Sequence, residues 1–367
     1  MVARIASRFS LLLLAAPPLL VLAAPPLWAQ AVGERVVPTN QVVISGYGTI
    51  GYNYRPFGEK ENEFASTFNP IFLFQFQDRV LFEAELEFEL EEGVTETGLE
   101  YAQVDIMLAD NLTLVGGKFL LPFGVFGERL HPTWINKFPT APPIYGHHVA
   151  EFGAEPLLPI VSDLGIMGRA VFAGPRVNLA LNGYVVQGPS AEVDPAGGVP
   201  ELEFPASSED NNADKMFGGR VDLVVPPWAE FNFSFMNGDY DSEGVLDLTG
   251  FNAAAEFRVA KLELRGEYLE TRQEIETPTG FPTVRRRGFY AQAAYRWKAW
   301  EPVLRWTQVF DTKLNGTVLS EGAWQAGFGL DYWFNPSIAI MAGYELNREK
   351  GTELKNDRFV VHIAYGF

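Results

Sequence analysis

The last ten residues of the sequence, 358–367, read RFVVHIAYGF. Large apolar side chains alternate there with smaller or polar ones: Phe359, Val361, Ile363, Tyr365 and Phe367 on one side, and Arg358, Val360, His362, Ala364 and Gly366 on the other. Successive side chains of a strand point to opposite faces, so this period of two predicts one strand with two unlike faces. The first face is too aromatic for water, and the second carries arginine and histidine. This is typical of a strand that separates lipid from a polar lumen.

The same alternation recurs earlier in the chain. Aromatic and apolar side chains alternate with polar or small ones over residues 324–334 and 289–298. Over residues 80–90, the apolar set is interleaved with a run of glutamates, Glu83, Glu85, Glu87 and Glu89. A helix would distribute these glutamates around its circumference, whereas a strand collects them on one face. The pattern therefore predicts a strand with an acidic face.

Turn residues divide the chain into about sixteen such strands. Their expected centres lie near residues 47, 72, 85, 104, 115, 168, 181, 221, 232, 254, 266, 292, 306, 328, 341 and 362. Short connections, such as 77–78, 109–111, 173–175, 226–227, 260–261 and 335–336, alternate with much longer polar ones. An even number of strands, with short turns at one rim and long loops at the other, predicts an all-β fold: a transmembrane antiparallel β-barrel with short periplasmic turns. A soluble sandwich or propeller is the alternative, because these folds also combine alternating strands with turns.

The long connections fall on one side of this barrel. If the first strand ascends from the periplasm, the external loops are 54–66, 91–98, 119–161, 188–215, 238–246, 270–286, 312–321 and 347–356. The third, residues 119–161, is the longest. Its prolines restrict the backbone and favour a shaped insert over a flexible tether: Pro122, Pro132, Pro139, Pro142 and Pro143. We expect this loop to fold inward and narrow the channel.

The first 31 residues have the features of an export signal. Arg4 and Arg8 provide a positive start, and an apolar stretch, 11–24, follows it. Cleavage after Ala29 or after Ala31 would leave a small residue at the cleaved bond, which gives a signal at 1–31 and a single barrel at 32–367. An N-terminal membrane anchor is the alternative, but the apolar run is short and broken by prolines. We therefore expect export to the periplasm and insertion into a Gram-negative outer membrane.

Composition excludes several classes of function. The chain has 367 residues and no cysteine, so disulfides, thiolate metal sites and cysteine nucleophiles are excluded. Its formal net charge of −18 argues against a nucleic-acid partner, which requires a clustered positive surface. No nucleophile motif supports a serine hydrolase, and glutamate pairs are uninformative in an acidic channel. We expect no enzyme activity and no cofactor.

Charged residues on the inner strand faces are the candidate functional residues. The basic ones are Lys118, Arg169, Arg220, Arg265, Arg296 and Arg305, and the acidic ones are Glu83, Glu85, Glu87 and Asp105. Opposite charges on different walls would create a transverse field that orients polar solutes. The alternative is that these side chains only solvate the lumen and pair with one another.

The third loop is expected to carry the selectivity residues. Its candidates are Glu128, Arg129, His131, Lys137, His147 and His148. Adjacent histidines near Glu151 suggest metal ligands, but they lack the face-sharing spacing of a zinc helix, so we expect no metal. Gly46, Gly48 and Gly51 match the spacing of a dinucleotide fingerprint. They lie within an expected strand, so we interpret them as packing glycines.

Residues 117–124 read GKFLLPFG, a strand that runs into a Pro-Phe-Gly loop. This segment resembles the corresponding region of phosphate-selective porins, the porin O/P-like family of outer-membrane barrels. The resemblance implies a trimeric diffusion channel of roughly sixteen strands whose third loop lines the constriction. Phosphate-selective members are expected to present many inward Arg and Lys, whereas this chain is acidic. Lumen arginines would still leave local anion selectivity open, because the field inside a constriction matters more than net charge.

These observations predict a porin that forms a water-filled channel for passive diffusion of small hydrophilic solutes or ions. Its expected partners are outer-membrane lipid and lipopolysaccharide, the solutes themselves and two further copies of the chain as a homotrimer. A plugged barrel that acts as an adhesin or structural surface protein is the alternative. An outer-membrane hydrolase is a weaker one.

Overall fold

The computed structural model describes residues 40–56, 61–91, 93–146, 152–191, 199–200, 202–204 and 212–367. The expected export signal at 1–31 lies outside the described residues, as do His147 and His148. Among the described residues, no helix is long and apolar enough to cross a membrane.

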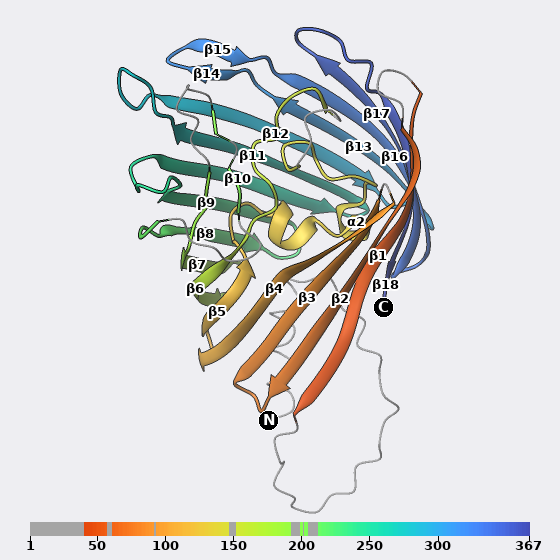
Figure 1. Cartoon of the computed structure of the whole chain (residues 1–367). Helices are drawn as coiled ribbons and strands as arrows, with labels where there is room; N and C mark the ends of the chain where they lie inside the picture. Colours follow the sequence, from red (N-terminus) through yellow and green to blue (C-terminus); the bar gives the residue numbers. More distant parts are fainter. Residues whose placement is uncertain are drawn as a thin grey trace, which may run out of the picture.

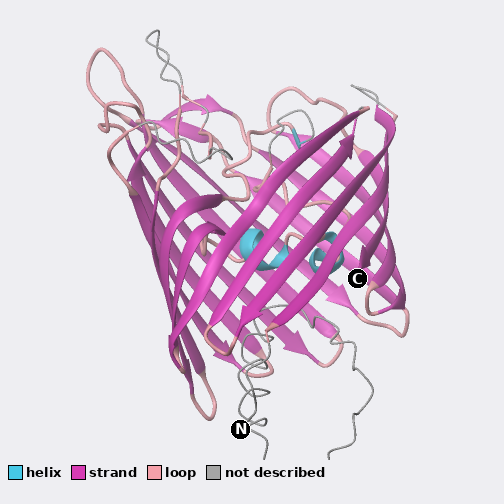
Figure 2. Cartoon of the chain, turned by 60° about the horizontal axis from the view of Figure 1, so that its bottom comes forward, coloured by secondary structure: helices cyan, strands magenta, loops and turns pink. Residues whose placement is uncertain are grey.

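The described chain forms one antiparallel sheet that closes on itself (Figures 1 and 2). The first half of the barrel consists of β1 (Gln41–Arg55), β2 (Glu61–Phe76), β3 (Val80–Glu91), β4 (Val94–Ala109), β5 (Leu112–Leu120), β6 (Ser162–Ala173), β7 (Asn178–Val186) and β8 (Met216–Val225). The second half consists of β9 (Ala229–Asp239), β10 (Asp247–Val259), β11 (Leu262–Glu274), β12 (Thr283–Tyr295), β13 (Trp300–Val309), β16 (Ala323–Asn335), β17 (Ile338–Glu349) and β18 (Arg358–Gly366). Two short strands, β14 (Thr312–Leu314) and β15 (Thr317–Ser320), extend the sheet within the connection from β13 to β16.

The barrel has sixteen strands because β13 pairs directly with β16, beside the β14–β15 hairpin. It closes where β18 pairs with β1, from Tyr47 opposite Gly366 to Tyr54 opposite Phe359 (Figure 1). Each of the sixteen expected strand centres lies within one barrel strand. The predicted fold class is therefore confirmed, and a soluble sandwich or propeller is excluded.

The two faces of each strand differ as the period of two predicts. On β18, Phe359 is 41% exposed whereas Val360 is fully buried, and on β16 Phe328 is 52% exposed whereas Asp331 is fully buried. The exposed set is apolar, and the buried set is largely polar or small except where the loop after β5 packs against it, which inverts the pattern of a water-soluble protein. Such an outer surface is stable only against lipid.

Glycines on β1 receive aromatic rings where the barrel closes. A Cβ atom at Gly46 would lie 2.6 Å from the Phe367 ring, and one at Gly48 would lie 2.6 Å from the Tyr365 hydroxyl. On the opposite face, the His362 ring approaches Gly51 equally closely. These glycines pack against side chains, as the sequence predicted, because a larger residue would displace the rings.

Turns of two to four residues join the strands at one end of the barrel, and longer loops join them at the other. The longest loop is the connection from β5 to β6, residues 121–161, which we call the inserted loop. It turns back between the strands and carries a short π-helix, η1 (Phe126–Leu130), and a helical turn, α2 (Thr133–Asn136), which lie inside the barrel (Figure 2).

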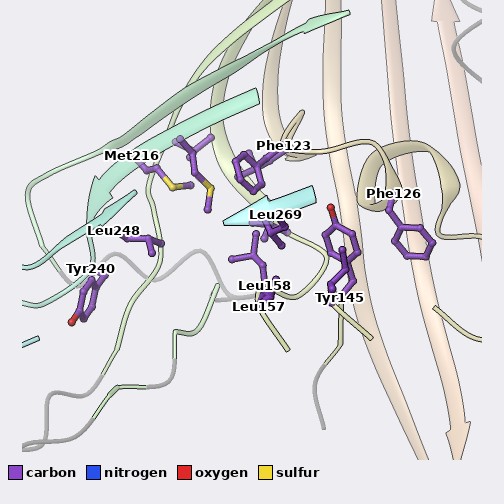
Figure 3. Close-up of a cluster of buried hydrophobic side chains, with 14 of the residues drawn as sticks. Phe123, Phe126, Tyr145, Leu157, Leu158, Met216, Tyr240, Leu248 and Leu269 are labelled. Carbon is purple, nitrogen blue, oxygen red and sulfur yellow. The ribbon is translucent and has the colours of Figure 1, made fainter. Parts of the chain in front are cut away.

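An apolar core fixes the inserted loop to one side of the lumen (Figure 3). Side chains of the loop, among them Phe126, Tyr145 and Leu158, are buried with wall residues such as Met216 and Leu269. Each such side chain contributes about 1.5–3 kcal/mol when it leaves water. The loop is therefore held as a packed element, consistent with the shaped insert predicted from its prolines.

Candidate channel constriction

Glu267 on β11 fixes the start of the inserted loop. Its carboxylate accepts hydrogen bonds from the backbone N–H groups of Val125, at 2.8 Å, and Phe126, at 3.3 Å. It also accepts one from the Tyr145 hydroxyl at 2.7 Å. The first N–H groups of a helix have no partner within the helix, so this carboxylate satisfies donors that would otherwise be buried without an acceptor. Glu267 thus ties two distant parts of the loop to one point on the wall.

Charged residues of η1 form a network with β6, β8 and β9. The Glu128 carboxylate lies 2.5 Å from the Arg220 guanidinium and 3.5 Å from that of Arg169. Arg129 pairs with Asp222 at 2.8 Å and with Glu230 at 2.6 Å. Burial alone would raise the pKa of Glu128, but the guanidinium groups around it hold its pKa at about 2. This carboxylate is therefore charged at neutral pH and stabilises the docked loop.

The segment after α2 is bound to β11, β12 and β13. Lys137 pairs with Glu263 at 2.8 Å and with Glu301 at 3.3 Å. The backbone carbonyl of Ile135 accepts hydrogen bonds from the Arg265 guanidinium at 3.3 and 3.4 Å. The Gln292 amide donates to the Asn136 carbonyl at 2.6 Å. The loop therefore replaces water as the partner of these inward polar groups.

Arg305 on β13 binds the middle of the inserted loop. Its guanidinium donates to the Thr140 carbonyl at 2.6 Å, lies 3.3 Å from the Glu345 carboxylate and covers the Phe138 ring at 4.1 Å. The Phe138 ring fits against a wall without side chains, because a Cβ at Gly327 would lie 2.8 Å from it. Arginine suits this position because its flat, weakly hydrated cation can bind an acceptor and stack on a ring together.

His131 reaches across the lumen to the opposite wall. Its Nδ1 lies 2.6 Å from the Gly127 carbonyl oxygen, and its Nε2 lies 2.9 Å from the Tyr47 hydroxyl on β1. Tyr47 in turn donates to the Glu85 carboxylate on β3 at 2.6 Å. Burial lowers the pKa of His131 to about 4 despite the bond to Gly127, so its ring is neutral at neutral pH. These close polar contacts link the loop to the acidic strand through β1.

The inner faces of β3 and β4 remain the most exposed part of the wall. Carboxylates that keep contact with solvent follow these two strands: Glu83, Glu87, Glu89, Glu96 and Glu100. By contrast, Arg265, Gln292 and Asp331 on the loop-covered wall are each less than a tenth exposed. Between described residues, the hydrogen bonds and ion pairs of the inserted loop reach β1, β6, β8–β13 and β17 but not β2, β3 or β4. The acidic strands therefore form the part of the inner wall that the loop leaves in contact with solvent.

The expected lumen arginines are placed on inward faces but differ in exposure. Arg220, Arg265 and Arg305 are buried against the inserted loop, whereas the Arg169 side chain is 25% exposed and lies beside Asn182 and Glu128. Arg296 belongs to the turn after β12, where it pairs with Glu301 and covers the Trp333 ring. Three of the arginines thus anchor the loop, so they are not available as a free cationic wall.

The expectation that Lys118 faces the lumen is wrong. On β5, Val115 is fully buried inside the barrel, and Lys118 has the opposite parity. It lies across from Ala102 on β4 and from Leu164 on β6, whose side chain is 37% exposed on the outer face. Its ammonium group bonds to the Leu99 carbonyl at 2.7 Å. The sequence around Lys118 does not show which face of the strand each residue occupies, because the two residues before it, Gly116 and Gly117, have no side chains to alternate.

Two inward carboxylates, Glu100 and Glu267, were missed in the sequence analysis. A register shift between β3 and β4 places Glu85 opposite Tyr101 and Leu86 opposite Leu99, which leaves Glu100 as an extra residue. This bulge interrupts the period of two, so counting by twos along β4 cannot assign its inner face. Glu267 could have been found, since it shares parity with Arg265 and alternates with outward Tyr268.

The structure holds no arrangement for a metal among its described residues: no three His, Asp or Glu side chains there could bind one ion together. Asp105 lies on the inner face of β4, where it bonds to Gln103 at 2.8 Å near Arg169. The loop residues His147, His148 and Glu151 lie outside the described part.

Solved structures of outer-membrane proteins share this architecture. OmpF of Salmonella typhi, solved in complex with daunomycin, has a TM-score of 0.59 and 14% identity over 89% of this chain and 98% of that one. An anion-selective porin from Comamonas acidovorans has a TM-score of 0.59 and 10% identity over 90% and 100% of the two chains. The channel DcaP of Acinetobacter baumannii has a TM-score of 0.58 and 10% identity over 92% and 100%.

No family model matches the sequence, and no curated protein is significantly similar to it. At the identities given above, the similarity to solved structures establishes the fold alone. Together with the lipid-compatible outer face, it shows that the chain is a transmembrane β-barrel with the fold of these porins.

Proposed function

We propose that the chain forms a channel for passive diffusion of small hydrophilic solutes, with its constriction between the inserted loop and strands β2–β4. The observation that carries this proposal is the unequal exposure of the inner wall. The loop buries the polar residues of β8–β13, β16 and β17, whereas carboxylates on β3 and β4 keep contact with water. A wall of exposed charge keeps a narrow passage hydrated.

The charge of this passage favours cations. Glu83 and Glu87 on β3 and Glu100 on β4 are partly exposed, whereas Arg220, Arg265 and Arg305 are buried against the loop, where they bind carboxylates and loop carbonyl groups. Arg169, whose side chain is 25% exposed and lies 3.5 Å from the Glu128 carboxylate, is the cation of β6 that stays partly accessible. Selectivity follows the charges that line the narrow part, so we propose weak cation preference in place of the anion preference that the arginines alone suggested.

Planar-bilayer recording tests both parts of this proposal. Refolded protein should give stepwise openings, with a reversal potential in a potassium chloride gradient that shows cation preference. The triple variant E83Q/E87Q/E100Q should lower the cation-to-anion permeability ratio by about twofold or more, because the fixed negative potential is removed. A matched control is E243Q/E276Q/E321Q, which removes three exposed glutamates from external loops and should leave the ratio unchanged.

Two results would contradict the proposal in different ways. If folded protein gives no stepwise openings and liposomes exclude every small sugar and ion, the barrel is plugged, and an adhesive or structural role replaces the channel. If channels open but the triple variant and the control give the same ratio, the acidic strands do not line the narrow part.

The same proposal includes the surroundings of the barrel. We infer contact with outer-membrane lipid and lipopolysaccharide at the apolar outer face, and assembly as a homotrimer. One structure with this fold, OmpT of Vibrio cholerae, is described in a trimer form, with 10% identity and a TM-score of 0.56. The GKFLLPFG segment supports kinship with phosphate-selective porins, but the acidic passage does not favour phosphate as the solute.

A further inference from the structure

A cluster of cations lies on the outer, lipid-facing side of β11, β12 and β14. Arg272 lies opposite Arg285 in the β11–β12 register, and Arg287 lies opposite Glu270. Arg285 is also opposite Lys313 on β14. Residues directly opposite each other in an antiparallel pair project from the same face. All four cations therefore share the face of Tyr268 and Phe289, which points away from the lumen.

The cluster sits at the boundary of the apolar band. The guanidinium of Arg272 lies 5.3 Å from the centre of the Phe251 ring, and that of Arg287 lies 5.0 Å from the centre of the Phe310 ring. From this level to the short-turn end, the outward residues of β11 and β12 are apolar or small, apart from Tyr268 and Tyr295. Aromatic rows mark the membrane–water interface of such barrels, so the four cations lie at the height of lipid headgroups on the long-loop side.

Glu270 organises this cluster without neutralising it. Its carboxylate accepts hydrogen bonds from Arg272 at 2.9 Å, from Arg285 at 2.6 Å and from the Tyr268 hydroxyl at 2.8 Å. Among described residues it is the one carboxylate within ion-pair distance of the four cations, because Asp311 pairs with Lys350 and Glu274 lies further toward the loops. A local excess of positive charge therefore stands on the surface of a chain whose net charge is −18.

We propose that Arg272, Arg285, Arg287 and Lys313 bind the phosphorylated headgroup of a glycolipid in the outer leaflet. Guanidinium groups recognise phosphate with paired hydrogen bonds, and Glu270 holds two of them in place beforehand. The flanking rings of Phe251, Phe289 and Phe310 provide the surface for the acyl chains of the same molecule. A free phosphate ion would use the cations but not these rings, which is why the site fits a lipid. This inference rests on the lipopolysaccharide contact proposed above and on the membrane barrel, but not on the proposed channel.

Native mass spectrometry of the full chain in neutral detergent tests this site, with diphosphoryl lipid A as the probe. Wild-type protein should retain the lipid, fail to retain its dephosphorylated form, and keep it in millimolar inorganic phosphate. The variant R272Q/R285Q/R287Q should bind roughly a hundredfold more weakly, because each basic residue near an anionic membrane surface contributes about fivefold. The control R79Q/R176Q/K261Q removes three positive charges from turns at the short-turn end of the barrel, and it should bind the lipid like wild type.

If the glutamine variant does not fold, as judged by heat-modifiable migration, the variant R272K/R285K/R287K is used to test the site instead. It keeps the charge but loses the paired geometry, so retention should fall by about tenfold. Wild-type affinity in a folded variant, equal retention of dephosphorylated lipid, or full displacement by inorganic phosphate would each overturn the lipid assignment. Conductance of the same variants should match wild type, which separates failure of this site from failure of the channel.

Discussion

At the scale of single residues, the inside of this barrel is governed by the cost of burying charge. Arg305 and Glu345 are fully buried as side chains and lie 3.3 Å apart. Such a pair is expensive to break, because removing one partner leaves an uncompensated charge away from water. The same reasoning applies to Glu128, whose three arginine neighbours come from the loop and from two strands.

Glu128 gives a prediction about acid stability. Its pKa is about 2 in the folded protein and 4.5 without the fold, so the folded state binds fewer protons in this interval. Its stabilisation is therefore complete above pH 4.5 and is lost as the pH falls toward 2. At pH 7, E128Q should cost about 3 kcal/mol of unfolding free energy. Urea unfolding in detergent at several pH values measures this difference.

The control for this prediction is E155Q. Glu155 pairs with Arg286 but is 47% exposed, so its loss should change the unfolding free energy by less than about 0.5 kcal/mol. A gap between wild type and E128Q that stays constant from pH 7 to pH 2.5 would show that Glu128 does not titrate as its surroundings require.

At the scale of elements, the inserted loop shows what a sequence can and cannot predict. The length of the loop, its inward fold and the effect of its prolines were predicted from the sequence, because they depend on the loop segment itself. The part of the wall that the loop covers was not predicted, since the contact of Phe138 with Gly327 and Gly329 joins segments almost two hundred residues apart. The parity of Lys118 and the bulge at Glu100 were missed for a related reason: both depend on the register with a neighbouring strand.

The contact between Phe138 and the glycine wall gives a prediction about this element. G327V would place its side chain within 2.8 Å of the Phe138 ring and should push the end of the loop off the wall, at a cost of about 1–3 kcal/mol. Hydrogen exchange over residues 133–141 should accelerate, and open-channel noise should rise. G183V is the matched control, because nothing lies within 4 Å of its Cβ position. Equal exchange in the two variants would mean that the wall glycines do not hold the loop.

At the scale of the whole molecule, the barrel could be predicted almost completely. Each strand separates two different solvents, so the alternation is strong in every strand and independent of the others. Charge placement inside the lumen could not be predicted to the same degree. The arginines at 220, 265 and 305 have the inward parity expected of a channel wall, yet each of them also binds the loop that covers it.

Closure of the barrel gives a prediction about the whole fold. The Phe367 ring covers Gly46 and stacks on Phe68 with ring centres 5.7 Å apart. F367A should lower stability by about 1 kcal/mol beyond the lost apolar area, because the ring pair is lost as well. Heat-modifiable migration across a temperature series measures this loss. F76A removes a 45% exposed ring at the same end of the barrel, and among the described residues this ring packs on no other ring, so F76A should have the smaller effect; the reverse order would show that the ring pair does not secure closure.

The one-sided apolar core described above also has a mechanical consequence. It braces the strands from β5 to β13 and β16, whereas β2, β3 and β4 are supported mainly by their own ladder of hydrogen bonds. When the lateral pressure of the bilayer changes, the wall should bend where it is least braced. That flexible sector carries the carboxylates at 83, 87 and 100, so the width of the passage should respond to membrane tension while the loop stays in place.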